Sequence, residues 1–283
     1  MADNQRTIAK PVMIKGVGLH TGRKCRATVS PAAENAGIRF VRTDLPGAPS
    51  FSAHVKNVVD VVRGTTLGQG DARVYTIEHV LSALNGLEID NVTIEMDENE
   101  PPVMDGSAKT FVEQLRAAGI VEQSAPKKYF TVITPFEYSA NHTVIRIEPS
   151  DTFEIDCEVD YNHPVIAKQR LGFIRGDDYA QKIAPARTFC FDYEIEALKK
   201  NGLAKGGSLD NAIVVGPEGI YNPGESLRFK DEFVRHKVLD LMGDLMLLGQ
   251  PLKAKITALR CGHGHNIKFL RALLASRETA TIN

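Results

Sequence analysis

Residues 231–247 read DEFVRHKVLDLMGDLML, and this stretch decides how the chain folds. In its second half only Asp240 and Asp244 are charged, and every other residue is apolar or glycine. A helix that is apolar on nearly every side is usually buried between other elements. We therefore predict a central helix over residues 225–248, which stops at Gly249 because glycine commonly ends helices.

Two carboxylates on a buried helix require a compensating positive charge. At about 100° per residue, His236, Asp240 and Asp244 fall on one narrow stripe of this helix. An unpaired ionised carboxylate is costly inside a protein, and a divalent metal ion held by His236 and Asp240 would offset that cost. Buried salt bridges to Arg or Lys are the alternative, and they are the commoner explanation of an isolated H-x-x-x-D pattern.

A second segment, TIEHVLSALNGL at residues 76–87, brings a histidine and a carboxylate together. We predict a helix here with Thr76 as its N-cap, so that Glu78 and His79 lie in the first turn. A histidine ligand near a carboxylate is typical of zinc hydrolases, in which the metal acidifies a water molecule and a glutamate takes its proton. Both segments together offer three zinc ligands with room for water: His79, His236 and Asp240. Taken alone, Glu78 is explained as an acidic residue favoured by the helix dipole.

A third segment, RCGHGHN at residues 260–266, predicts a glycine-bearing loop between a strand and the last helix. A histidine on such a loop is well placed for proton transfer, because its ordinary pKa lies near neutrality. Asp244 could orient its ring and stabilise the cation. A hydrogen-bonded loop histidine without catalytic function is the alternative, and spacing does not decide between His263 and His265.

The order of predicted elements repeats along the chain. Each half reads strands, a helix, a strand, a loop and a second helix, and the polar segment 122–128 (EQSAPKK) reads as a linker between them. Strands followed by helices favour an α+β fold. We expect two similar halves, residues 1–125 and 126–283, that pack helix face to helix face as a sheet–helix–helix–sheet sandwich.

Residues 187–224 have no counterpart in the first half. Their composition predicts a short helix and a strand around a glycine-rich turn. The apolar residues of this insert either pack on the body of the protein or help to enclose a long apolar ligand.

Composition excludes several classes of function. The net charge of −1 and the pI near 6.7 argue against binding to nucleic acid. The N-terminus lacks the features of a signal peptide, and no apolar run is long enough for a transmembrane segment. The four cysteines are Cys25, Cys157, Cys190 and Cys261, and no two of them form a C-x-x-C pair. We therefore expect free thiols and a cytoplasmic protein.

Six motifs in order along the chain carry a family resemblance: GVGLHTG at 16–22, TIEH at 76–79, MDGSA at 104–108, ARTF at 186–189, HKVLDLMGD at 236–244 and GHGHN at 262–266. In this combination the chain resembles the UDP-3-O-acyl-N-acetylglucosamine deacetylases, the zinc enzymes that commit bacteria to lipid A synthesis. His265 departs from the family pattern, which has a small or apolar residue there.

The resemblance implies two similar α+β halves facing each other through their helices, each with an insert, and a Zn²⁺ cofactor. It places the zinc ligands on His79, His236 and Asp240, the general base on Glu78, the general acid on His263 and the partner of that acid on Asp244. It also places a hydroxyl near the oxyanion on Thr188, substrate contacts on Phe189 and Lys237, and the passage for the acyl chain on the insert at about 190–215. The implied partner is an acylated UDP-sugar substrate, and we expect a monomer.

Two other functions fit the same residues. One is a zinc amidase acting on another acylated sugar or on a small amide. The other is a binding protein without catalytic activity, in which zinc holds the two halves together.

Overall fold

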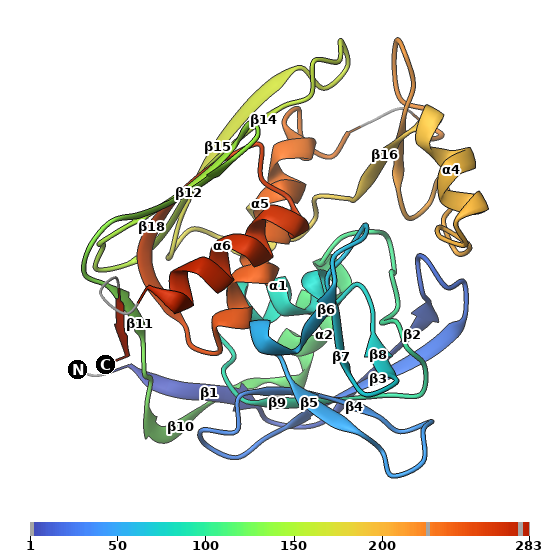
Figure 1. The fold of residues 1–283 in the computed structure, drawn as a ribbon. Coiled ribbons are helices and arrows are strands. Elements are labelled where there is room, and N and C mark those ends of the chain that lie inside the picture. Colours follow the sequence, from blue (N-terminus) through green and yellow to red (C-terminus); the bar gives the residue numbers. More distant parts are fainter. Residues whose placement is uncertain (1–2, 225–226, 277–279, 283) are drawn as a thin grey trace.

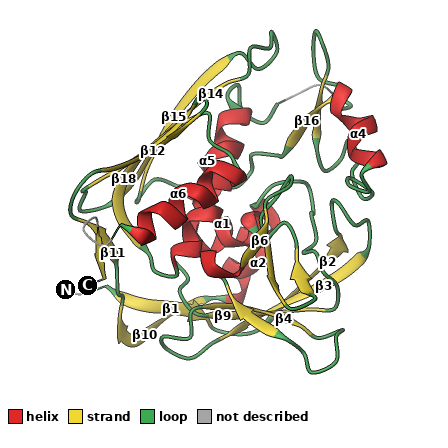
Figure 2. Ribbon diagram, viewed as in Figure 1, coloured by secondary structure: helices red, strands yellow, loops and turns green. Residues whose placement is uncertain are grey.

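The computed structural model describes residues 3–224, 227–276 and 280–282. Two sheets form the outer layers, and helices fill the space between them (Figures 1 and 2). The principal helices are α1 (Glu78–Gly86), α2 (Lys109–Ala118), α5 (Glu232–Leu245) and α6 (His263–Ala275). The predicted α+β class is confirmed, and the layers follow the predicted sheet–helix–helix–sheet order.

The first sheet has five strands, in the order β2 (Val12–Val17), β3 (Lys24–Pro31), β9 (Val92–Met96), β4 (Ile38–Arg42) and β5 (Ser50–Ser52). Neighbouring strands in this sheet are antiparallel, except that β4 and β9 run parallel to each other. Buried and more exposed residues alternate along β4 and β9. This alternation is expected of a sheet with one face against the helices.

The second sheet is built around β18 (Leu252–Leu259), which pairs with three strands. The other strands are β11 (Phe130–Val132), β12 (Phe136–Ala140), β13 (Thr143–Glu148), β14 (Phe153–Asp160), β15 (Lys168–Ile174) and β19 (Ala280–Ile282). Strand β14 alternates strictly between buried and half-buried residues. Its buried face, like that of β18, lies toward α5 and α6 (Figure 1).

Smaller elements surround these layers. Three further sheets pair β1 (Asn4–Ile8) with β10 (Ile120–Pro126), β6 (Val58–Asp60) with β7 (Thr66–Gln69) and β8 (Ala72–Val74), and β16 (Phe189–Phe191) with β17 (Ile213–Val215). The short helices are η1 (Val55–Asn57), α3 (Tyr179–Lys182), η2 (Asp192–Glu194), α4 (Ile195–Lys200) and η3 (Met246–Leu248). Elements β16 to β17, with α4 between them, form the predicted helix-and-strand insert.

Helices α1 and α5 make the central contact between the two layers, and both are buried over almost their whole length. Their backbones approach closely at Gly243, where an added Cβ would lie 2.1 Å from the carbonyl oxygen of Glu78. The amide of Asn85 also donates to the carbonyl oxygen of Met242, 2.9 Å away. This close packing brings the start of α1 against the middle of α5.

Two predicted segments have a different structure. Residues 122–128 do not form a linker, because most of them belong to strand β10, which pairs with β1. Backbone pairing at the edge of the fold stabilises this strand, so its polar side chains need no burial. The central helix begins at Glu232 rather than at 225, since the chain from 227 to 231 turns before it. Residues 225 and 226 lie outside the described part of the chain.

Two helix starts were also predicted wrongly. Thr76 is not the N-cap of α1, because its backbone has a φ of 52° and its hydroxyl donates to Glu100. The N-cap is Ile77, which has no side-chain cap hydrogen bond. In the last predicted loop, α6 already begins at His263, directly after Gly262, and therefore includes most of the glycine-histidine motif.

Candidate metal centre and catalytic site

The three predicted metal ligands lie together at the α1–α5 crossing. His79 comes from the first turn of α1, and His236 and Asp240 lie one turn apart on α5. One potential ligand atom from each lies within 4.8 Å of the other two, and all three side chains are buried. Residues separated by more than 150 positions in the sequence thus converge on one point, as a shared ion requires.

The hydrogen bonds of His236 show that this cluster fits a cation. Its Nδ1 lies 3.1 Å from the carbonyl oxygen of Ala186, and a carbonyl only accepts, so Nδ1 carries the proton. The unprotonated Nε2 then faces Oδ1 of Asp240 at 3.3 Å. That oxygen is buried and has no hydrogen-bond donor. Two lone pairs directed at each other repel, and a metal ion between them would turn this repulsion into coordination.

Protonation of the cluster also suits metal binding. Burial and the neighbouring His236 lower the pKa of His79 to about 3, and burial lowers the pKa of His236. Burial by itself raises the pKa of Asp240, but His236 and Lys237 outweigh it and hold that pKa well below its usual range. The cluster therefore offers two neutral imidazoles and a carboxylate at neutral pH, which are the forms that bind zinc.

Lys237 binds the other oxygen of the aspartate. Its Nζ lies 2.7 Å from Oδ2 of Asp240 and 5.5 Å from the ring centre of Phe189. Burial disfavours the ammonium, but Asp240 outweighs this effect and raises the pKa of Lys237. A permanently charged lysine thus lies at the edge of the cluster.

Glu78 and His263 face each other beside the cluster. Nε2 of His263 lies 3.6 Å from Oε1 of Glu78 and 3.9 Å from Oδ2 of Asp240. Burial, with Asp240 and Asp244 nearby, raises the pKa of Glu78 to about 7, against the lowering effect of His263. Burial alone lowers the pKa of His263, but Asp244 and Glu78 outweigh it and raise the pKa to about 10. The pair combines a weakly acidic carboxyl group with a protonated imidazole.

Asp244 holds the ring of His263 in place. Its Oδ2 accepts hydrogen bonds from Nδ1 of His263 and from the Asn266 amide, both at 2.8 Å. Its Oδ1 accepts a hydrogen bond of 2.6 Å from the hydroxyl of Thr65. The backbone N–H of Thr65 also donates to Oε2 of Glu78 at 2.9 Å. Thr65 therefore connects the two carboxylates, a role that no sequence pattern around it indicated.

His265 lies apart from this site. Its Nδ1 is 3.1 Å from the hydroxyl of Tyr138 on β12, and the two rings pack against each other. The structure thus separates two histidines that spacing could not distinguish. His263 is the one that contacts Asp244.

Phe189 lies next to His236, and Thr188 directly precedes it in the chain. The Phe189 ring centre is 6.2 Å from that of His236 and 5.0 Å from that of Phe233. The backbone N–H of Thr188 donates to the carbonyl oxygen of Gly106 in the MDGSA segment. Phe189 also borders an apolar cluster of the insert and its neighbours, formed by Ile166, Phe191, Ile213, Val215 and Phe233.

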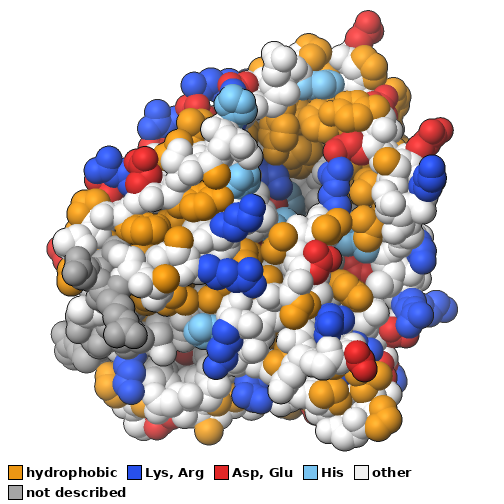
Figure 3. All heavy atoms as spheres, viewed as in Figure 1, with side chains coloured by type: hydrophobic (Ala, Val, Ile, Leu, Met, Phe, Trp, Pro, Cys, Tyr) orange, Lys and Arg blue, Asp and Glu red, His pale blue; other side chains and the backbone are white. Residues whose placement is uncertain are grey.

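Two cavities differ in their relation to the site. The smaller cavity, of about 280 Å³, is lined by the basic side chains of His20, Arg23 and Lys205. It also borders Gly64, which lies close to Glu78, because a Cβ added to Gly64 would be 2.9 Å from Oε1 of Glu78. Glu100 supports its wall, because this buried carboxylate accepts hydrogen bonds from the backbone N–H groups of His20 and Thr21. Sequence reasoning missed Glu100. On the face shown in Figure 3, hydrophobic side chains line a hollow with basic (Lys or Arg) and histidine side chains near it.

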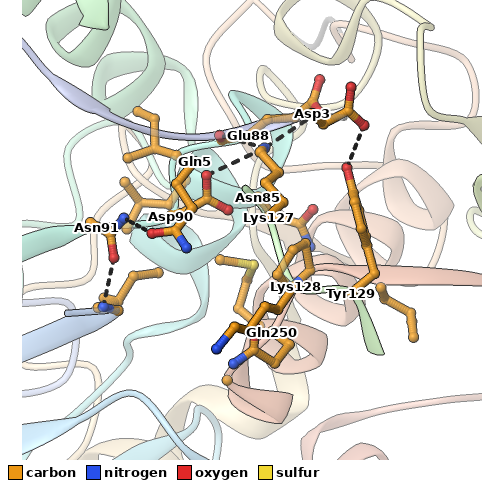
Figure 4. A pocket seen from close by; sticks show the side chains of 18 of the residues that line it. Asp3, Gln5, Asn85, Glu88, Asp90, Asn91, Lys127, Lys128, Tyr129 and Gln250 are labelled. Atoms are coloured by element: carbon orange, nitrogen blue, oxygen red, sulfur yellow. Dashed lines mark hydrogen bonds and ion pairs between the residues drawn. The ribbon is translucent and has the colours of Figure 1, made fainter. Parts of the chain in front are cut away.

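The other cavity, of about 500 Å³, is lined by residues at the C-terminal ends of α1 and η3, among others. Figure 4 shows its polar lining, in which Lys127 lies 3.3 Å from Asp90 and Tyr129 donates to Asp3. It contains none of the residues of the metal cluster. Lys127 forms ion pairs with both Glu88 and Asp90 in its lining.

Two histidines and an aspartate with an acid–base pair beside them form the candidate site of a metal-dependent hydrolase. The sequence profile of the LpxC family, UDP-3-O-acyl N-acetylglycosamine deacetylase, matches residues 5–275. The chain belongs to this family.

Curated relatives agree with this assignment. The chain is 45% identical to a UDP-3-O-acyl-N-acetylglucosamine deacetylase of Anaeromyxobacter sp. and 44% identical to that of Myxococcus xanthus. Both alignments cover 96% of this chain, and they cover 89% of the Anaeromyxobacter protein and 87% of the Myxococcus protein. It is also 42% identical to a bifunctional enzyme LpxC/FabZ of Chlorobaculum tepidum, of which it spans 64%.

Proposed function

We propose that this protein is a zinc-dependent deacetylase that hydrolyses the N-acetyl group of UDP-3-O-acyl-N-acetylglucosamine. The products are acetate and the free amine of the acylated UDP-sugar, and the reaction is the committed step of lipid A biosynthesis. The observation that carries the proposal is the convergence of His79, His236 and Asp240 beside Glu78 and His263. The family membership of the chain supports the choice of substrate.

His79, His236 and Asp240 would hold the zinc ion, because their donor atoms are the nitrogen and oxygen ligands that zinc accepts. When bound, zinc acts as a Lewis acid and lowers the pKa of water to near neutrality. The remaining chemistry belongs to side chains of the protein.

Glu78 is the general base in this proposal. Its carboxylate takes a proton from the attacking water as the water oxygen bonds to the acetamide carbon. Because its pKa is raised to about 7 by burial, it is a stronger base than an exposed glutamate and still partly ionised at neutral pH. The backbone N–H of Thr65 fixes its other oxygen and thereby its orientation.

His263 is the general acid. It carries a proton on Nε2, the nitrogen that faces Glu78, because Asp244 binds the opposite nitrogen and stabilises the cation. It donates this proton to the glucosamine nitrogen as the carbon–nitrogen bond breaks. The protonated ring and the hydroxyl of Thr188 would also stabilise the negative charge that develops on the carbonyl oxygen.

Lys237 and Phe189 would bind the substrate next to the reacting group. The ammonium of Lys237 suits the diphosphate side of the sugar nucleotide. Phe189 leads into the apolar cluster of the insert at about 190–215, whose aromatic and aliphatic side chains suit an acyl chain. The division into residues 1–125 and 126–283 belongs to the same proposal, with Glu78 and His79 in the first half and the remaining catalytic groups in the second.

The described residues form no helix that is long and apolar enough to cross a membrane. We propose that the protein acts in the cytoplasm, in keeping with its four free thiols. We also propose that it is a monomer. The test of the function is zinc content per chain together with acetate release from the acylated UDP-sugar. Equal rates on the same sugar nucleotide with and without the 3-O-acyl chain would favour the alternative amidase.

A further inference from the structure

Two cysteine thiols touch each other next to the proposed general acid. The sulfurs of Cys157 and Cys261 are 3.8 Å apart, and either thiol can donate a weak hydrogen bond to the other. Cys157 is fully buried in β14, whereas Cys261 is 8% exposed. All four cysteines of the chain are free, and Cys25 and Cys190 make no sulfur–sulfur contact. The pair is therefore distinct among the cysteines.

The backbone places this pair where a covalent bond would affect catalysis. Cys261 precedes Gly262, the N-cap of α6, and His263 is the first residue of that helix. Strands β14 and β18 are parallel neighbours, and after β18 the N–H of Arg260 still donates to the carbonyl oxygen of Glu158. Arg260 then adopts a φ of 51°, and the chain continues into Cys261 against β14. To form a disulfide, the two sulfurs would have to close from 3.8 Å to the S–S bond length of about 2.0 Å.

The electrostatic environment gives the two thiols different roles. The hydrogen bond from Cys157 lowers the pKa of the Cys261 thiol, and the Lys237 ammonium adds to this effect, whereas burial opposes it. The same hydrogen bond and burial raise the pKa of Cys157. The thiolate is the reactive form of cysteine. Cys261, which is also the more exposed, is thus the attacking sulfur, and Cys157 is the one that resolves the intermediate.

We propose that Cys157 and Cys261 form a reversible disulfide under oxidation by a peroxide, and that this bond displaces His263 and stops hydrolysis. The thiolate of Cys261 attacks one oxygen of hydrogen peroxide, which gives a sulfenic acid and hydroxide. The Cys157 thiol then attacks that sulfur, and the oxygen leaves as water with the proton of the thiol. In total, two thiols and one peroxide give one disulfide and two waters. Two electrons pass from sulfur to oxygen.

The functional consequence rests on the proposed function, because it requires His263 to be the general acid. Closing the sulfurs from contact to bonding distance pulls Cys261 toward β14. Gly262 connects Cys261 directly to His263, whose ring must stay against Asp244. A displacement of about 1 Å of a catalytic group can cost roughly 100-fold in rate.

The experiment uses the zinc-loaded full chain treated with hydrogen peroxide and then with dithiothreitol. Thiols are alkylated, and peptide mass spectrometry identifies the cross-link, so bond formation is read independently of any activity. Metal content is measured in the same samples. Acetate release is expected to fall about 100-fold with zinc retained and to recover on reduction. Cys157→Ala and Cys261→Ser each remove one partner, and a Cys25→Ala/Cys190→Ala double variant is the matched control.

The expected result is a cross-link between residues 157 and 261 in the wild type and in the double control, and none in either single variant. The single variants should also keep most of their activity in peroxide. Absence of the cross-link at peroxide concentrations that oxidise Cys190 would overturn the proposal. A cross-linked protein that hydrolyses its substrate at the normal rate would overturn the displacement of His263. A protein without deacetylase activity before oxidation would instead contradict the proposed function and leave the cross-link readable.

Discussion

Nδ1 of His263 lies 2.8 Å from Oδ2 of Asp244, and the opposite nitrogen of the same ring faces Glu78 at 3.6 Å. The aspartate belongs to α5 and the histidine to α6, so the packing of these two helices fixes which ring nitrogen points into the site. A ring held in this way can carry a proton on the nitrogen that faces the substrate and cannot turn it away. Asp240 lies one turn earlier on the same helix and contacts His236 and Lys237 instead.

Replacing His263 by alanine should lower kcat by about 10²–10⁴-fold, because general acid catalysis typically contributes this much. Zinc content should not change, since His263 is not among the clustered ligands. His265→Ala is the matched control, because that ring binds Tyr138 instead of Asp244. Steady-state acetate release and metal analysis on both variants measure the effect. A loss in His265→Ala with none in His263→Ala would show that the wrong histidine has been assigned, and equal losses would show that the effect is not specific to His263.

Asp244→Asn should move the alkaline limb of the activity profile to lower pH. In the wild type the pKa of His263 is raised to about 10, so the acid stays protonated through neutrality and activity falls as pH rises through that value. Without the negative charge of Asp244 this pKa drops, and the fall begins earlier. The acidic limb, where Glu78 becomes protonated as pH falls, should change less. The measurement is kcat/KM against pH, and coincident alkaline limbs would contradict the role of Asp244.

Removal of zinc by a chelator should abolish acetate release and leave the fold intact. The cluster is only one small part of a core in which α1 and α5 are buried along almost their whole length. Without metal, Asp240 also keeps its ion pair with Lys237. Far-ultraviolet circular dichroism should therefore be unchanged, and added zinc should restore activity. Gross unfolding on chelation would instead support a protein in which zinc only holds the halves together.

Asp240→Asn is the companion variant to chelation. It has nearly the shape of the wild type but lacks the charge that the metal requires. Added zinc should fail to restore its activity, and its zinc content should be low. Full zinc content in this variant would exclude Asp240 as a ligand.

Much of the site could be predicted from the sequence because helical spacing carries the information. His236, Asp240 and Asp244 follow one another at intervals of one turn, so any helix places them on one stripe. The family motifs then linked this stripe to Glu78 and His79 on a distant segment. The structure brings all of these residues together, as the predicted convergence requires.

Residues whose contribution is a single hydrogen bond could not be predicted in this way. Thr65 and Glu100 lie outside any periodic pattern, and their partners are fixed only when the chain has folded. The strand at residues 120–126 was missed for a related reason, because its pairing with β1 depends on backbone groups that every sequence has. The early start of α6 was missed because the glycines of the motif favour a loop by local propensity.

Gly243 shows how strongly the site depends on the crossing of α1 and α5. In the sequence it is only a weak helix former in an apolar helix, but an added Cβ there would lie 2.1 Å from the carbonyl oxygen of Glu78 and 2.9 Å from its Cα. Because these are backbone atoms, no side-chain rotation can relieve the clash, and the helices must separate. Gly243→Ala should therefore destabilise the protein by about 1–3 kcal/mol. It should also lower kcat by about 100-fold, since Glu78 and His79 would move away from α5.

The matched control is Gly219→Ala, where an added Cβ would meet no heavy atom within 4 Å. That variant should unfold within about 0.5 kcal/mol of the wild type. Denaturant unfolding and acetate release on both proteins make the comparison. If Gly243→Ala matched the control in both measurements, α1 and α5 could move apart without loss of stability or activity. Contacts other than the α1–α5 crossing would then have to hold Glu78 and His79 in position.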